Sequence, residues 1–333
     1  MRKLLLTCSI VVLTYGEHCR ADFTLGPDFV TDYTAVSLGI VPDLPFPYGG
    51  LTFIDSNTIL IGGAANGPAG NLYTIDVVRD LDGHITGFDG AATAFGDVGE
   101  YNDGGVVFGP GGVLFTAQWN IHQLGQTKPG SLDEDKVIDL TPIFPGDISI
   151  SALNFVPFGF SGAGEMKLVT YPGGSWYTAD FAPDGSGTFK ILGVTHEDLD
   201  SVEGGIQNLP GGPEGFVYIA AGNDGFLVNS MLVAEYAAGK IAAYEVDLHG
   251  NPILTTRREF ITDLFHAEGA AVDPVTGDFL FSTFGGGDQV VVVSGFDVPL
   301  PPPPTVPEPS TFTLLGLGVL GLAGYARRRR SIA

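Results

Sequence analysis

Cysteine and basic residues are scarce in this sequence outside its two ends. Both cysteines lie within the first twenty of the 333 residues, which excludes a disulfide scaffold or thiol chemistry in the body of the chain. Seven of the 15 lysines and arginines lie in residues 2–20 and 327–330, so residues 22–306 hold eight basic residues against 36 acidic ones, a net charge of about −28. Nucleic acids and anionic membrane surfaces are polyanions, so this charge disfavours both as partners of the body.

The sequence also lacks the spacings of a zinc site and of a serine hydrolase. The histidines after residue 21 form no HxH or HExxH pattern, and no Gly-x-Ser-x-Gly segment occurs. No long stretch of the body shows a helical period. Hydrophobic residues nevertheless make up 44% of the chain, which excludes a disordered protein.

The N-terminus has the features of an export signal. Arg2 and Lys3 form a positive start, and residues 4–13 are mostly apolar, too few for a membrane span of about 20 residues. Small residues precede a cleavage point between Ala21 and Asp22. We therefore predict a signal peptide over residues 1–21.

The C-terminus has the features of a second sorting device. A proline-rich linker over residues 299–306 favours an extended conformation. Residues 311–326 are uncharged and largely apolar, and we expect a single transmembrane helix there, followed by Arg327, Arg328, Arg329 and Arg330. The arginines place the tail in the cytoplasm and the body outside, which agrees with the export signal.

The triplet Pro307, Glu308 and Pro309 stands before the apolar stretch and the arginines. In this order and spacing, residues 307–330 resemble the PEP-CTERM sorting domain of exported bacterial proteins. The resemblance implies recognition of the triplet and processing near it by a membrane enzyme, the exosortase, in bacteria that make exopolysaccharide. A plain tail anchor is the alternative.

The body contains a phrase that recurs five times. It begins at Tyr48, Asp103, Ile150, Glu203 and Glu268, and its second and third residues are small, mostly glycine. Two further short apolar runs follow each phrase and are predicted as strands. The second runs are 58–61, 113–117, 167–171, 231–236 and 278–283, and the third runs are 71–77, 121–124, 176–181, 240–246 and 289–293.

A unit of about 50 residues with three or four strands is typical of a β-propeller blade. We predict an all-β propeller over residues 22–298 with five blades, in which a lone strand at 29–38 completes the last blade and removes exposed edges. Six blades remain an alternative, because residues 214–227 leave room for another element, and a β-sandwich is the other alternative. The pattern loosely resembles the propellers of the NHL and gluconolactonase-like groups.

Carboxylates open three of the five phrases: Asp103, Glu203 and Glu268. The first strand of each blade lines the central channel, so these side chains are expected at one height around it. Close carboxylates are stabilised by a shared hard cation such as Ca²⁺, with Asn102 and His266 as neighbours. A solvated acidic rim is the alternative. Trp119, Trp176, Tyr73 and Tyr177 either stack on sugars or fill blade cores.

These observations predict a non-enzymatic exported protein of the cell surface or extracellular matrix. Secretion machinery and an exosortase-like enzyme are its expected partners, and the propeller presents a site for glycan (such as exopolysaccharide), cation or protein. An extracytoplasmic metal-dependent hydrolase or lactonase is the alternative, and a permanently anchored receptor is a third interpretation.

Overall fold

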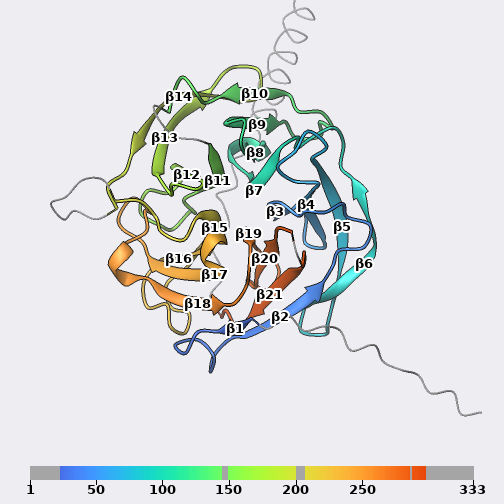
Figure 1. Ribbon diagram of the computed structural model, residues 1–333, viewed down its shortest axis with the longest axis vertical. Helices are drawn as coiled ribbons and strands as arrows, with labels where there is room; N and C mark the ends of the chain where they lie inside the picture. The colour runs from blue at the N-terminus through green and yellow to red at the C-terminus, as the bar shows by residue number, and fades with distance from the viewer. Residues whose placement is uncertain (1–22, 145–148, 200–206, 286, 298–333) are drawn as a thin grey trace, which may run out of the picture.

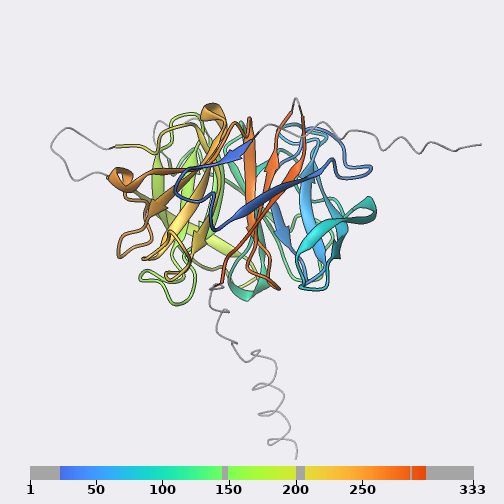
Figure 2. The ribbon, with the colours of Figure 1, turned by 90° about the horizontal axis from the view of Figure 1, so that it is seen from below.

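Five antiparallel sheets surround a central axis (Figure 1). The structure, a computed structural model, describes residues 23–144, 149–199, 207–285 and 287–297. From the side, the sheets form a short cylinder (Figure 2). The chain is therefore a five-bladed β-propeller, as the repeats predict, and neither six blades nor a sandwich is correct.

Each blade is ordered from the axis outwards, and successive blades follow one another in the chain. The first blade is β3 (Leu51–Phe53), β4 (Thr58–Gly63), β5 (Asn71–Arg79) and β6 (Ile85–Ala94), and the second is β7 (Asn102–Phe108), β8 (Leu114–Gln118), β9 (Gln123–Thr127) and β10 (Lys136–Asp139). The third is β11 (Ile150–Phe155), β12 (Met166–Thr170), β13 (Trp176–Pro183) and β14 (Phe189–His196), and the fourth is β15 (Pro213–Ile219), β16 (Ser230–Glu235), β17 (Lys240–Glu245) and β18 (Arg258–Thr262). The fifth is β19 (Ala267–Val272), β20 (Phe279–Thr283), β21 (Val290–Ser294) and, from the N-terminal end of the described chain, β2 (Thr34–Gly39).

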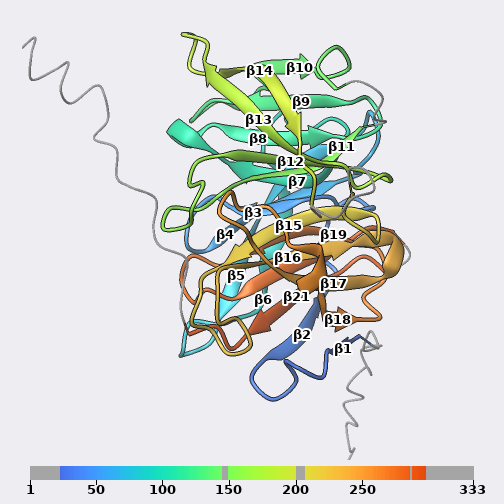
Figure 3. The same ribbon diagram turned by 90° about the vertical axis from the view of Figure 1, so that its left-hand side faces the viewer.

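The N-terminal segment closes the ring. Strand β2 pairs with β21, with Thr34 opposite Ser294, and the short strand β1 (Thr24–Leu25) pairs with β18, as Figure 3 shows. The strand predicted at 29–38 therefore has the predicted role, although it begins only at Thr34. Phe29 lies in the turn before this strand and Tyr33 directly precedes the strand. The rings of both residues pack on Phe260, at centroid distances of 4.9 and 5.6 Å.

The hydrophobic core is divided among the interfaces between blades. Five clusters of buried side chains fill the five gaps between adjacent sheets. The cluster between the fourth and fifth blades includes Phe29, Tyr33 and Phe260 and is extended by Phe226 and Phe296. The N-terminal segment thus buries aromatic area as well as pairing strands, and both contributions hold the ring closed.

The predicted second and third strands agree with the observed ones to within three residues. The outermost strands β6, β10, β14 and β18 were not individually predicted, because many of their side chains are exposed and their apolar pattern is weak. The fourth phrase was misplaced: the inner strand of that blade is Pro213–Ile219, ten residues beyond Glu203. Its sequence, Pro-Glu-Gly-Phe, carries one glycine where the phrase at 203 carries two.

Several predictions concern parts of the chain outside the described residues. The signal peptide with its cleavage point at Ala21 and Asp22, the proline-rich linker and the sorting tail all belong to these parts. Within the described ranges, none of the helices reaches the length and hydropathy of a membrane span.

Candidate metal centre at the channel mouth

A recurring backbone hydrogen bond shows which positions of the blades are equivalent. In four blades the residue after the second strand donates its N–H to the residue just before the inner strand: Trp119 to Tyr101, Tyr171 to Ser149, Tyr236 to Gly212 and Phe284 to His266. In the first blade Ala65 donates to Pro47. Equivalent positions therefore lie two residues beyond each acceptor, just before β3 in the first blade and within the inner strand in the other four. They are Gly49, Asp103, Ser151, Glu214 and Glu268.

Three carboxylates of this level meet at the axis. Asp103, Glu214 and Glu268 each offer an oxygen, and these oxygens lie within 4.8 Å of one another. The three residues are only 1%, 4% and 1% exposed. Asp103 Oδ1 and Oδ2, Glu214 Oε2 and Glu268 Oε1 are buried with no hydrogen-bond donor in the described chain. We call these three residues the carboxylate triad.

Burial and the proximity of like charges dominate the electrostatics of the triad. Burial raises the pKa of Asp103 to about 6, although contacts with Glu268, Asn66 and Glu214 lower it. Burial, reinforced by the charge of Asp103, raises the pKa of Glu214 well above its usual range, and burial together with the charges of Glu214 and Asp103 does the same for Glu268. Burial and mutual repulsion therefore both favour the protonated forms of these three carboxyls.

The donor set fits a hard divalent cation. Calcium binds carboxylate and carbonyl oxygens at about 2.3–2.6 Å, so two ligands of one calcium ion lie no more than about 5 Å apart. The oxygens of the triad satisfy this limit. All three side chains offer only oxygen, which suits Ca²⁺ better than a softer transition metal. A bound cation would also supply the charge partner that the buried oxygens lack.

A ring of glycines lies directly beyond the triad along the inner strands. A Cβ added to Gly104 would lie 2.7 Å from Gly215 N, and one added to Gly215 would lie 2.5 Å from Glu268 O. A Cβ on Gly269 would lie 2.6 Å from the Cα of Gly50, and one on Gly50 would lie 2.6 Å from Gly104 O. The recurring glycine is therefore required because the inner strands approach backbone to backbone at the axis.

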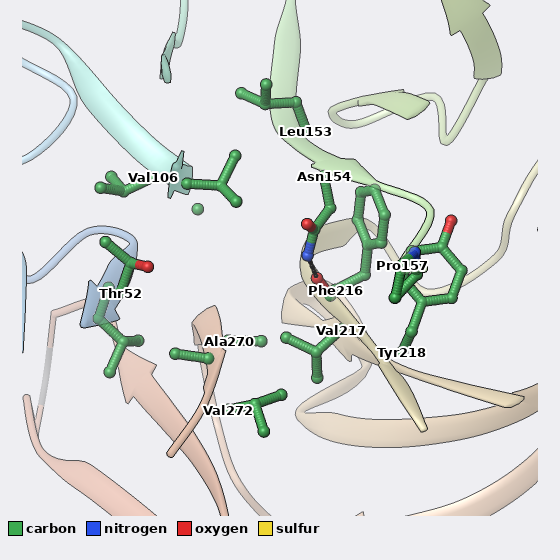
Figure 4. Close-up of a pocket in the computed structure, with 14 residues that line it drawn as sticks. Thr52, Val106, Leu153, Asn154, Pro157, Phe216, Val217, Tyr218, Ala270 and Val272 are labelled. Atoms are coloured by element: carbon green, nitrogen blue, oxygen red, sulfur yellow. Dashed lines mark hydrogen bonds between the residues drawn. The ribbon is translucent and has the colours of Figure 1, made fainter. Parts of the chain in front are cut away.

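Beyond the glycines, the channel widens into a cavity of about 150 Å³ (Figure 4). Its walls come from all five inner strands and are mostly apolar, with Val106, Leu153, Val217 and Val272 among them. Thr52 and Asn154 are polar exceptions, and the Asn154 amide donates to the backbone oxygen of Phe216. None of the described residues that line the cavity is charged, so the acidic groups of the channel lie at the carboxylate end.

The sequence-predicted site residues have different outcomes. Asp103 and Glu268 lie together at the axis, whereas Glu203 lies outside the described residues. Asn102 donates to Gly99 O, and its carbonyl lies against Gly49 and Gly62 in the first blade rather than in the triad. His266 is exposed and stacks on Tyr236, at the same end of the channel.

Glu214 is the site residue that sequence reasoning missed. Its segment, Glu-Gly-Phe-Val, has the carboxylate, the glycine and the apolar run of the other inner strands. The predicted alignment instead paired Glu203 with Tyr48 and Ile150, whose side chains are buried in cores between blades. A double glycine at 204–205 was a misleading signal, because one glycine is enough for the close approach in the fourth blade.

Solved structures with a similar arrangement include several enzymes. The PQQ domain of pyranose dehydrogenase from Coprinopsis cinerea is 10% identical, with 83% of this chain and 97% of that chain covered and a TM-score of 0.43. A glucose dehydrogenase-type oxidoreductase from Thermus thermophilus is 12% identical, with 79% and 100% covered and a TM-score of 0.44. A streptogramin B lyase is 12% identical, with 79% and 98% covered and a TM-score of 0.41. Similarity at this level transfers no function to the present chain.

No curated protein matches the chain. A family model described as the PEP-CTERM protein-sorting motif matches residues 305–330, which include the predicted triplet and arginines. This motif indicates an exported protein that is processed by an exosortase, a membrane enzyme. The chain is therefore a five-bladed β-propeller that carries a PEP-CTERM sorting motif at its C-terminal end.

Proposed function

We propose that this protein is a cell-surface or extracellular-matrix binding module whose site is a calcium ion held at the channel mouth. Asp103, Glu214 and Glu268 would hold the ion, and the bound ion would present its remaining coordination positions to an external ligand. The observation that supports the proposal most directly is the set of buried carboxylate oxygens for which the described residues provide no hydrogen-bond donor. The rigid inner strands keep these oxygens together, so little reorganisation is needed for binding.

A thermal melt of the metal-free chain, with and without added calcium, tests the site. A ligand that binds only the folded state stabilises it by about 2.7 kcal/mol at one hundred times its Kd. We expect calcium to raise the melting temperature of the wild type by several degrees and to leave Asp103→Asn/Glu268→Gln unchanged. An equal response of both proteins would place any bound calcium elsewhere and would contradict the proposal.

The sorting part of the proposal concerns the tail. We propose that the signal over 1–21 directs secretion, that residues 311–326 anchor a precursor in the membrane, and that cleavage near Pro307–Pro309 releases the propeller towards the cell surface. Mass spectrometry of the surface-extracted protein is expected to find a chain that ends before Thr311. An intact tail on that protein would instead support a permanently anchored receptor.

Hydrolysis is the second candidate function, because the three carboxylates that could hold a divalent ion lie within 4.8 Å of one another. A cation bound by such a site can lower the pKa of a coordinated water. In a metal-dependent lactonase or esterase, Asp103 would serve as one of the ligands of the ion. Calcium-dependent turnover of a lactone panel, lost in Asp103→Asn but retained in Asp89→Asn, would favour this candidate over a pure binding module.

A further inference from the structure

The turn after the second strand carries an aromatic side chain in four of the five blades. Trp119 follows β8, Tyr171 follows β12, Tyr236 follows β16 and Phe284 follows β20. The backbone hydrogen bonds to the residues before the inner strands hold these turns beside the start of those strands. Together with His266, these residues form what we call the aromatic arc.

The rings of the arc contact one another around the channel mouth. Trp119 meets Tyr171 at a centroid distance of 5.9 Å, Tyr171 meets Tyr236 at 5.6 Å, and Tyr236 meets Phe284 at 6.0 Å. His266 stacks on Tyr236 at 4.7 Å with nearly parallel planes. The four aromatic residues after the strands are half-buried and His266 is exposed, so part of the arc faces solvent.

The arc is interrupted at the first blade. The residue after β4 is Ala64, and the turn that follows presents Asn66. The Asn66 side chain contacts Asp103, and its Oδ1 has no hydrogen-bond partner in the described chain. A ligand that approaches from this side would therefore meet an amide and the carboxylate triad, with Trp119 and Phe284 on the neighbouring blades.

The arc and the triad belong to one electrostatic environment. Burial and the charges of the three carboxylates of the triad raise the pKa of Tyr171. Burial, the same three charges and the charge of Tyr171 raise the pKa of Tyr236 to about 12. Both hydroxyls are therefore protonated donors at neutral pH. Neither hydroxyl has a hydrogen-bond partner among the residues that the structure describes.

We infer that the aromatic arc binds a pyranose sugar, with its apolar face against the rings and two adjacent hydroxyls on the calcium ion at the triad. A sugar ring combines C–H faces with a polar edge, and the site combines aromatic faces with free donors and a hard cation. Aromatic rings fill the cores between blades as well, but those rings are sequestered: Trp176 is fully buried and donates to Asn251 Oδ1. The inference rests on the proposed calcium site, because the ion supplies the contact to the hydroxyls.

Tryptophan fluorescence of the whole chain tests this inference. The chain has two tryptophans, and only Trp119 belongs to the arc. Methyl mannoside and methyl glucoside are titrated into the protein with calcium and with EDTA, and choline is titrated in parallel. We expect one of the sugars to give a saturable change in emission that requires calcium and that disappears in Trp119→Phe. The affinity for that sugar should fall about tenfold in Tyr236→Ala, because an aromatic contact contributes up to about 1.5 kcal/mol.

Controls separate this inference from the proposed calcium site. Phe158→Ala removes an exposed aromatic side chain at the far end of the strands and is expected to bind the sugar like wild type. Circular dichroism melts establish that each variant folds. Calcium binding without any sugar response up to the solubility limit overturns the inference and leaves the calcium site in place. A sugar response that persists in EDTA contradicts the calcium bridge and overturns the inference. A saturable fluorescence change with choline but not with sugar would assign the arc to organic cations and would also overturn it.

Discussion

At the scale of single residues, the unusual feature of this protein is a set of three buried acids with no ion-pair partner among the described residues. Asp103, Glu214 and Glu268 all have raised pKa values, chiefly because they are buried. A carboxyl whose pKa is higher in the folded than in the unfolded chain holds an extra proton when folded. The stability that this proton provides is present at low pH and is lost as the pH rises from the unfolded to the folded pKa.

The metal-free protein should therefore lose stability as the pH rises above about 4, by up to about 1.4 kcal/mol per pH unit for each carboxyl that is still protonated in the folded chain. For Asp103 this loss ends at about pH 6, and for the two glutamates it continues towards higher pH. Glu214→Gln removes one of the three titrating groups, so its unfolding free energy should depend less on pH in this window. Urea unfolding at a series of pH values in EDTA measures the slope. Asp89→Asn, on an exposed outer strand, also removes one negative charge and should keep the wild-type slope.

If Glu214→Gln and the wild type showed the same slope in that series, the triad would be ionised throughout and the argument from burial would be wrong. Saturating calcium should act in the opposite direction in the wild type. The ion competes with protons for the same oxygens, so its stabilising effect should increase with pH.

A second residue-scale prediction concerns the ion pair between Arg79 and Asp273. Arg79 Nη1 and Nη2 bind the two carboxylate oxygens at 2.6 and 2.8 Å, and the Asp273 side chain is fully buried. Arg79→Ala leaves this charge buried without its partner, so we expect the free energy of unfolding to fall by about 3–5 kcal/mol. Urea unfolding gives the value.

The matched control is Lys240→Ala, which breaks a half-exposed pair with Glu259. Exposed ion pairs contribute less than about 1 kcal/mol, so this variant should be close to wild type. An equal decrease in the free energy of unfolding in the two variants would show that the burial of Asp273 does not determine the effect of Arg79→Ala.

At the scale of elements, the glycines of the inner strands set how closely the blades approach. Gly104→Ala and Gly215→Ala force a methyl group into neighbouring backbone, and overpacking of this kind costs about 1–3 kcal/mol or more. Gly193→Ala on the outer strand β14 is the control, because nothing lies within 4 Å of an added Cβ there. That change should be neutral or stabilising by up to about 1 kcal/mol.

Denaturant midpoints of these three variants test the packing of the axis. A lower denaturant midpoint in Gly104→Ala and Gly215→Ala, but not in Gly193→Ala, would confirm that the inner strands approach closely. A midpoint for Gly104→Ala equal to that of Gly193→Ala would mean that the blades stand further apart than the structure has them.

The sequence was most informative where strands are buried. The second and third strands were predicted well because their apolar runs, such as Trp176–Phe181 and Val290–Val293, must be buried between blades. The outer strands have a weak apolar pattern, because their exposed positions tolerate almost any polar residue. The position of the fourth inner strand was not recoverable from the pattern, because Glu203 and Glu214 both precede glycine and only the three-dimensional register separates them.

The aromatic arc was only partly visible in the sequence. Of the four aromatic residues that the sequence offers for sugar contact, only Trp119 belongs to the arc. Trp176 and Tyr177 are buried between blades, and Tyr73 packs against the core between the fifth and first blades. The signal that identifies the arc is the aromatic residue directly after the second strand in four of the five blades. That signal requires the strand ends to be known, and apolar periodicity does not fix the ends of strands to a single residue.

At the scale of the whole molecule, the sorting motif and the proposed binding site belong to different segments of the sequence. The motif at 305–330 indicates export and processing by an exosortase, and the carboxylate triad belongs to the propeller. Residues 22–306 carry about −28 net charges, and this charge raises the local concentration of divalent cations around the whole surface. A specific calcium site must therefore be distinguished from general attraction of cations by its stoichiometry and by single substitutions.

Calorimetric titration of calcium into the metal-free chain makes this distinction most directly, using wild type, Glu214→Gln and Glu203→Gln at moderate salt. We predict one calcium per chain for the wild type and for Glu203→Gln, and loss of that binding in Glu214→Gln. No saturable binding in the wild type, or loss in Glu203→Gln with retention in Glu214→Gln, would contradict a calcium centre formed by Asp103, Glu214 and Glu268.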